Sequence, residues 1–307
     1  MNKKMVILDG GMSRELIRLG AELRQPEWSA LALIDAPDIV RQVHCEFIQA
    51  GADVITTNSY ALVPFHIGEE RFRSEGLTLI EMSGMLARQA ADGEINRKIT
   101  VAGSLPPIFG SYEPQLFDPL RAQEYLSVLV QGLSPYVDVW LGETLSLIAE
   151  GEAVRTAIAA TGKPFWISFT LDDSVAAIAS GEATLRSGES VADAAEWLAG
   201  SGATTLLFNC SQPEVMAKAI RIASGIFKRL GKDIEIGVYA NAFESQEEGG
   251  ANETLHDTRK ELTPELYSKF ACGWAESGAS MIGGCCGIGA SHIHALARTL
   301  RSNGQSA

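Results

Sequence analysis

Residues 49–58 read Gln-Ala-Gly-Ala-Asp-Val-Ile-Thr-Thr-Asn, and this pattern decides the fold. An amphipathic helix ends at Gly-Ala, a short apolar strand follows, and a polar residue ends the strand. The same order recurs at residues 201–210 and 277–283. A glycine just beyond a helix supplies a left-handed cap, and short apolar runs are typical of strands buried on both faces of a parallel sheet. The pattern therefore predicts alternating helices and parallel strands.

The same alternation extends along the whole chain. We expect strands at residues 5–9, 53–58, 98–104, 137–143, 164–170, 204–210, 235–241 and 280–285. We expect helices at residues 36–50, 69–92, 119–133, 146–161, 189–201, 212–230, 263–277 and 290–302. Eight such pairs favour a closed barrel over an open sheet, because no predicted strand carries the charges or prolines of an edge strand. The predicted fold class is therefore α/β, a (β/α)8 TIM barrel, with residues 1–307 as a single domain.

Composition excludes several classes of protein. The chain is 46% hydrophobic and 21% charged, as soluble globular proteins are, and no apolar run approaches the roughly 18 residues of a membrane helix. A net charge of -13 argues against a nucleic-acid partner. The apolar run at residues 5–8 is too short for a signal peptide, so we expect a cytoplasmic protein. Its five cysteines are then expected to be thiols.

Polar residues end every predicted strand. In chain order they are Asp9, Asn58, Ser104, Glu143, Thr170, Asn209 with Cys210, Asn241, and Cys285 with Cys286. Barrel enzymes place their reactive groups where strands end and the loops to the helices begin. Three long connections, at residues 105–119, 171–188 and 242–263, would lie on the same rim, and long loops in compact domains are usually lids or binding loops.

Three cysteines fall on this predicted rim: Cys210 follows one strand, and Cys285 and Cys286 follow another. Thiolates select Zn²⁺, and three protein ligands with an open fourth position describe a catalytic site. The alternative is that cysteine is simply a small buried apolar residue, and we keep that interpretation for Cys45 and Cys272, which lie mid-helix. The Gly287-Ile288-Gly289 turn could instead hold a phosphate at a helix start.

Three motifs together are similar to those of a known family. Asp9-Gly10-Gly11, Asn209-Cys210 and the glycine-flanked Cys285-Cys286 pair resemble, in order and spacing, the homocysteine S-methyltransferase family over essentially the whole chain. The resemblance implies a (β/α)8 barrel in which the three cysteines hold Zn²⁺, the homocysteine thiol takes the fourth position, and methyl transfer gives methionine.

The resemblance also implies the substrate contacts. Asp9 and Glu143 match acidic positions that hold the homocysteine amino group, with Gly10, Gly11 and Asn209 also at the substrate site. No catalytic residue is expected beyond the zinc site, because a metal-bound thiol needs no general base.

The methyl donor is predicted from charge. Aromatic residues at or beyond strand ends could face a cation: Tyr60, Phe109, Tyr112, Tyr239 and Phe243. Acidic residues of the predicted seventh loop add negative charge: Glu244, Glu247, Glu248 and Glu253. A small cationic donor, such as S-methylmethionine or S-adenosylmethionine, is therefore expected, with Tyr60, Tyr239 and Asn241 as donor contacts.

Other functions remain open at this point. Sulfonium-using members often carry Tyr-Pro-Asn followed by Gly-Glu, whereas residues 239–244 read Tyr-Ala-Asn-Ala-Phe-Glu. The alternatives are betaine as the donor, a cobalamin-carrying partner protein, another thiol or a selenol as the acceptor, and a zinc and amino-acid binding protein without turnover. The sequence does not decide the oligomeric state.

Overall fold

The computed structural model describes residues 5–180, 183–243 and 259–303. Its centre is one parallel sheet of eight strands, with the spatial order β1-β8-β7-β6-β5-β4-β3-β2. The strands are β1 (Val6–Ile7), β2 (Val54–Thr56), β3 (Thr100–Leu105), β4 (Val139–Leu145), β5 (Phe165–Phe169), β6 (Thr205–Asn209), β7 (Glu235–Ala240) and β8 (Met281–Gly284).

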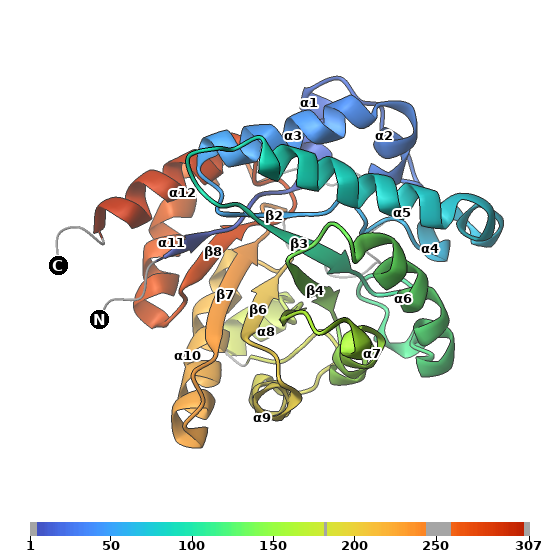
Figure 1. The fold of residues 1–307 in the computed structure, drawn as a ribbon. Helices are drawn as coiled ribbons and strands as arrows, with labels where there is room; N and C mark the ends of the chain where they lie inside the picture. The colour runs from blue at the N-terminus through green and yellow to red at the C-terminus, as the bar shows by residue number, and fades with distance from the viewer. Residues whose placement is uncertain (1–4, 181–182, 244–258, 304–307) are drawn as a thin grey trace.

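The sheet closes on itself through its first and last strands. β1 pairs with β8, with Val6 opposite Met281, and a parallel bridge joins Leu8 to Val54 at the start of β2. Figure 1 shows the dark blue first strand beside the red β8 near the C-terminus of the chain. The predicted (β/α)8 barrel is therefore confirmed.

Eight helices surround the barrel at the predicted positions (Figure 1). They are α3 (Pro37–Ala50), α5 (Glu69–Asp92), α6 (Pro119–Leu133), α7 (Ile148–Ile158), α9 (Val191–Ser201), α10 (Pro213–Leu230), α11 (Pro264–Ser277) and α12 (Ala290–Asn303). The three Gly-Ala junctions behave as predicted, since Gly51, Gly202 and Gly278 end α3, α9 and α11 in the left-handed conformation.

Short helices that the sequence pattern did not predict lie in the connections. They are α1 (Met12–Arg18), α2 (Ser29–Asp35), α4 (Pro64–Ile67) and α8 (Val175–Ser180), together with the 3₁₀ turns η1 (Pro114–Leu116) and η2 (Ala159–Thr161). Each is seven residues or shorter, so each offers too few turns for a clear helical period.

Two apolar layers hold the barrel together. One large cluster packs the outward faces of the strands against the helices, and includes Phe47, Trp140 and Trp274. A smaller cluster, including Leu141, Leu207 and Met281, comes from residues that alternate with the outward-facing ones along the strands. The barrel is therefore filled at its centre.

Within the described residues, no helix is long and apolar enough to cross a membrane.

Candidate metal and substrate site

A cavity of about 330 Å³ opens at the carboxyl ends of the strands. Most of the predicted site residues line it: Asp9, Gly10, Gly11, Tyr60, Glu143, Cys210, Tyr239, Asn241, Cys285 and Cys286. They come from the ends of six strands and the segments that follow them. Parallel strands deliver their carboxyl ends to one rim, so residues far apart in the sequence share this wall.

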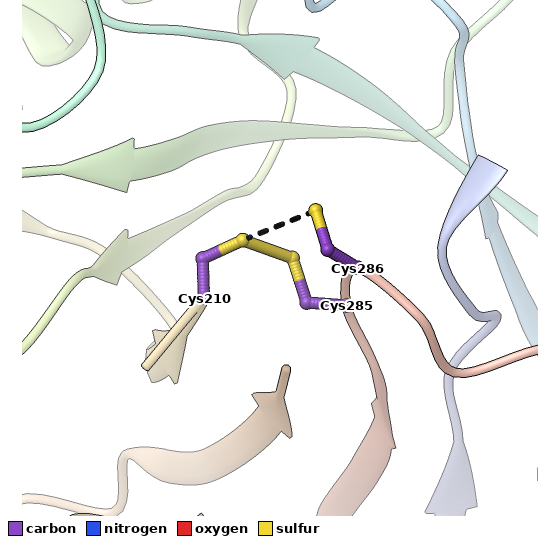
Figure 2. A group of neighbouring side chains, drawn as sticks. All are labelled: Cys210, Cys285 and Cys286. Carbon is purple, nitrogen blue, oxygen red and sulfur yellow. Dashed lines mark hydrogen bonds between the residues drawn. A yellow bond between two sulfur atoms is a disulfide. The ribbon is translucent and has the colours of Figure 1, made fainter. Parts of the chain in front are cut away.

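The three predicted cysteines lie together on the cavity wall (Figure 2). Their sulfur atoms all lie within 4.8 Å of one another, and within the described residues they form the one His, Cys, Asp or Glu group close enough to hold a metal. Cys45 in α3 and Cys272 in α11 stay apart from this group. The rim geometry that the sequence predicted for the cysteines is therefore present.

Two of these cysteines form a disulfide, which differs from the expected set of thiols. Cys210 and Cys285 are bonded, with their Cα atoms 5.6 Å apart, a separation within the usual range for disulfides. The ends of β6 and β8 thus hold the two sulfurs close enough to pair. Cys286 remains free.

The donor set fits a zinc ion once the pair is reduced. The Cys210 and Cys286 sulfurs are 3.9 Å apart, and a tetrahedral site with Zn–S distances near 2.3 Å separates its sulfurs by about 3.8 Å. Burial raises the pKa of the Cys286 thiol to about 12. An uncharged thiol is therefore favoured there unless a bound cation stabilises the thiolate.

A buried carboxyl group, Asp9, and a partly buried one, Glu143, lie on the same cavity wall. Asp9 accepts hydrogen bonds from the Thr56 backbone N–H at 2.7 Å and from its hydroxyl at 3.3 Å, and Glu143 accepts one from the Ser104 hydroxyl. Burial, and secondarily the Glu143 charge, raises the pKa of Asp9 to about 8. Burial raises the pKa of Glu143 to about 7. The ammonium group of a ligand would stabilise both carboxylates and so offset the unfavourable effect of their burial.

Gly10 and Gly11 bring the first loop into contact with the cysteine loop. A Cβ atom on Gly10 would lie 2.3 Å from the Ile288 carbonyl oxygen, and one on Gly11 would lie 2.5 Å from that of Cys285. The Gly11 amide already donates to the Ile288 oxygen at 2.8 Å. Both glycines line the cavity, but the Gly11 N–H group is committed to the protein backbone.

Asn209 lies outside the residues that line the cavity, although the sequence placed it at the substrate site. Its side-chain oxygen accepts from the Ser168 hydroxyl at 2.6 Å and from the Thr144 N–H at 3.2 Å. Its amide nitrogen donates to the Thr144 hydroxyl at 2.7 Å and lies 3.9 Å from the Cys285 sulfur. Asn209 therefore links the ends of β4, β5 and β6 beside the Cys285 sulfur.

The predicted donor contacts Tyr60, Tyr239 and Asn241 all line the cavity, and the other aromatic residues considered for the donor are split between the cavity and the core. Tyr60, Tyr112, Tyr239 and Phe243 line the cavity, whereas Phe109 packs against the apolar core. Asn241 lines the cavity and accepts from the Phe243 N–H at 3.3 Å. The acidic residues of the seventh loop, Glu244, Glu247, Glu248 and Glu253, lie outside the described residues.

Backbone strain is concentrated at this cavity. Among the described residues, four non-glycine residues have positive φ angles, and all four line the cavity: Trp28, Tyr112, Thr144 and Cys210. Such conformations cost on the order of 1–3 kcal/mol each and persist only where surrounding structure enforces them. Trp28 was not predicted from the sequence. It lies in the long connection from 10 to 35, and the length of that connection could have indicated a binding loop.

A charged pair on the rim was also missed. Asp173 and Arg186, both from the segment between β5 and α9, line the cavity. Their side chains form an ion pair with an Nη2–Oδ1 distance of 2.8 Å. The length of this segment was recognised, but neither residue follows a strand directly, so no strand-end pattern pointed to them.

Comparison with known proteins places this site in context. The sequence model of a family described as "Homocysteine S-methyltransferase" matches residues 6–300. Homocysteine S-methyltransferase 1 of Brassica oleracea var. italica is 30% identical, with 96% of this chain and 93% of the relative covered. A selenocysteine methyltransferase of Astragalus bisulcatus is 27% identical, with 99% and 94% covered.

Solved structures agree with the sequence relatives. The metallated form of the homocysteine methyltransferase MmuM from Escherichia coli superimposes with a TM-score of 0.78 at 26% identity, covering 97% of this chain and 96% of that one. The oxidized form of the same enzyme gives 0.78 at 27% identity, covering 96% of each chain. With the barrel, the cysteine cluster and these full-length matches, the chain belongs to the homocysteine S-methyltransferase family.

Proposed function

We propose that this protein transfers a methyl group to the thiol of homocysteine, giving methionine, at a zinc site made by Cys210, Cys285 and Cys286. The observation that carries the proposal is that three cysteine sulfurs within 4.8 Å share one cavity with the carboxyl groups of Asp9 and Glu143. The cysteines suit a thiol-binding metal, and the carboxyl groups suit an amino-acid ammonium. Homocysteine carries both a thiol and an ammonium group.

The metal proposal follows from the donor set. Zinc prefers sulfur ligands and takes three of them, with an open fourth position, in catalytic sites. A zinc ion held there would keep a coordinated substrate thiol deprotonated at neutral pH, which is the chemistry that the metal supplies. The Cys210–Cys285 disulfide must be reduced before the cysteines can provide three thiolates.

The chain's own residues would hold and orient the substrate. Asp9 and Glu143 accept the ammonium group, which fixes the distance from the amino-acid head to the sulfur. Asn209, through its contact with the Cys285 sulfur and its bonds to Thr144 and Ser168, keeps the metal ligands in place. Positioning of this kind can lower a barrier by about 7–11 kcal/mol.

A small cationic methyl donor is supported by the cavity wall. Tyr60, Tyr239 and Trp28 present aromatic surfaces there, and Trp28 and Tyr60 meet edge to face with ring centroids 6.3 Å apart. Aromatic faces attract sulfonium and ammonium groups. The volume of about 330 Å³ is at the lower end for small-molecule sites, which favours S-methylmethionine over the larger S-adenosylmethionine.

The experiment is a donor and acceptor panel. The purified, reduced and zinc-loaded protein is incubated with homocysteine and one donor at a time: S-methylmethionine, S-adenosylmethionine, betaine or a methylcobalamin-carrying protein. Methionine is then quantified by mass spectrometry. Methionine formed only with the cobalamin protein would overturn the sulfonium proposal, and binding of zinc and homocysteine without any product would indicate a binding protein.

A second acceptor is supported by one comparison. The similarity to a selenocysteine methyltransferase makes a selenol a candidate acceptor at the same metal. Selenocysteine should therefore be included as a competing acceptor, and the ratio of the two methylated products measured.

A further inference from the structure

The segment between β5 and α9 brings a cation into the cavity. Leu171 bridges Leu185, and the Arg186 amide donates to the Thr170 carbonyl at 3.0 Å, so the two ends of the segment are tied together beside β5. This places Arg186 among the cavity-lining residues. The proposed chemistry so far gives this arginine no role.

The guanidinium group of Arg186 is held from two sides. Asp173 accepts from its Nη2 at 2.8 Å, and the ring of Tyr112 lies beneath it, 4.5 Å from the guanidinium carbon to the ring centroid. The other Asp173 oxygen accepts from the Gln212 N–H at 2.9 Å. The cation is therefore fixed in a defined orientation.

The Tyr112 side chain also connects this cation to the metal site. Its hydroxyl donates to the carbonyl oxygen of Cys210 at 3.1 Å, while its ring supports Arg186. A single side chain therefore sets the position of the guanidinium relative to a metal-ligating residue. A ligand that reaches from the metal to Arg186 would be recognised at both of its ends.

One donor of this guanidinium group is left without an acceptor. The Arg186 Nε atom is buried and makes no hydrogen bond with any residue that the structure describes. A buried donor without a partner is costly, and an arginine fork binds carboxylates through two adjacent N–H groups. An arriving carboxylate would satisfy the Nε group.

The charges around the cavity fit a zwitterion. With zinc bound, three thiolates would give the cysteine cluster a net negative charge that attracts the sulfonium group of a donor. The guanidinium group of Arg186, beside Asp173, presents N–H donors to a carboxylate instead. We propose that Arg186 binds the carboxylate of a zwitterionic methyl donor and so selects amino-acid sulfonium compounds over sulfonium compounds without a carboxylate. This inference rests on the proposed function, since it names the donor class for the same cavity.

The test compares S-methylmethionine with its carboxamide, which keeps the sulfonium and ammonium groups but lacks the negative charge. Calorimetry on the reduced, zinc-loaded protein measures binding of each compound, and methionine formation measures turnover. We expect the acid to bind at least about tenfold more tightly than the amide, which corresponds to about 1.4 kcal/mol. Arg186→Gln should remove this preference while leaving amide binding within about twofold. Arg186→Lys should keep part of the preference, because it retains the charge but loses the planar fork.

A matched control and three other measurements separate recognition from structure. Arg155→Gln removes an arginine that pairs with Glu152 on the surface of α7, away from the cavity, and should change neither affinity. Zinc content, unfolding temperature and the KM for homocysteine are measured for each variant. If Arg186→Gln weakens acid and amide equally, lowers zinc content, or raises the homocysteine KM instead, Arg186 does not recognise the donor carboxylate.

The two proposals fail in different ways. An Arg186-dependent preference for the acid in binding, without any methionine formed, would support the donor site while refuting methyl transfer. Methionine formation with equal use of acid and amide would support the proposed function and overturn the role of Arg186.

Discussion

Tyr112 and Cys210, 98 residues apart in the sequence, are joined by a 3.1 Å hydrogen bond from the tyrosine hydroxyl to the cysteine carbonyl. Both have left-handed backbones, with φ angles of 67° and 50°. Each conformation is unfavourable alone, and contacts of this kind are what retain it. The loop after β3 thus helps to hold a metal-ligating residue at the end of β6, and the metal site depends on more than the strands that carry its ligands.

Replacing any one of the three clustered cysteines should abolish tight zinc binding. Cys210→Ala, Cys285→Ala and Cys286→Ala each remove one of three thiolates, while the barrel core is untouched. Zinc per chain, measured by mass spectrometry after purification under reducing conditions, should fall from about one to near zero. Cys45→Ala and Cys272→Ala are the controls and should retain the metal. Equal losses in all five variants would show that unfolding, not ligand removal, explains the effect.

Removing the Glu143 carboxylate should weaken homocysteine binding without loss of zinc. A buried charged group that loses its partner typically costs a few kcal/mol, so Glu143→Ala should raise the homocysteine Kd by tenfold or more. Calorimetry on the zinc-loaded protein measures this, and metal analysis checks the zinc. An unchanged Kd would remove Glu143 from the substrate site.

The pKa values of the two carboxyl groups predict a pH-dependent stability. In the metal-free protein, folding raises the Glu143 pKa from 4.5 to about 7, so between those pH values the folded chain binds a proton that the unfolded chain has lost. The free energy of unfolding should therefore fall as pH rises through this range, by at most about 1.4 kcal/mol per pH unit for this group.

The measurement is urea unfolding of the reduced, metal-free protein at several pH values. Glu143→Gln should show a shallower decrease between pH 4.5 and 7, because its amide does not titrate. Asp9→Asn should reduce the decrease over a range extending to about pH 8, the folded-state pKa of Asp9. Identical slopes in wild type and both variants would mean that neither carboxyl group carries a proton in the folded protein.

Gly284→Ala should destabilise the protein and release the metal. The added Cβ would lie 2.0 Å from Ile288 Cγ2, so the loop that begins at Cys285 would have to move. Overpacking of this kind costs about 1–3 kcal/mol. Gly200→Ala, in α9 with no atom within 4 Å of the added Cβ, is the matched control and should gain up to about 1 kcal/mol from helix propensity. Urea unfolding and zinc content are measured for both variants. Normal zinc content in Gly284→Ala would contradict the tight packing.

Tyr239 should contribute its ring rather than its hydroxyl to donor binding. The buried hydroxyl lies near the Glu143 carboxylate and the Ser168 hydroxyl but forms no hydrogen bond of normal geometry with the described residues, whereas the ring lines the cavity. Tyr239→Phe should therefore retain methionine formation from S-methylmethionine within a few fold, and Tyr239→Ala should lose most of it, as expected for a cation–π contact. A similar loss in both variants would indicate that the hydroxyl is the important group.

The barrel and the cysteines were predictable because they rest on local patterns. Apolar runs between polar ends locate the eight strands, and the observed strands start and end within two residues of the predicted ones. Closing eight parallel strands brings their carboxyl ends to one rim. Cys210 and Cys285 had to lie near each other once the strand order was known.

The cavity residues that lie on irregular connections could not be predicted in the same way. Trp28, Tyr112 and Arg186 lie on irregular connections, where position depends on long-range bonds such as those of Tyr112 to Cys210 and of Arg186 to Asp173. The role of Asn209 was also hidden, because only the structure shows that its amide is used by the ends of neighbouring strands. Local sequence patterns carry no information about such pairings.

The pairing of β1 with β8 has a consequence for biosynthesis. On this side of β1, Val6 and Ile7 pair with Met281 and Ile282, and Gly11 finds its acceptor in Ile288. While a ribosome is still elongating the chain, the first strand has no neighbour on that side, and Asp9 has no cysteine loop to face. Metal binding at the proposed site must therefore follow completion of the last strand, and until then one edge of the unfinished sheet is left unpaired and open to wrong partners.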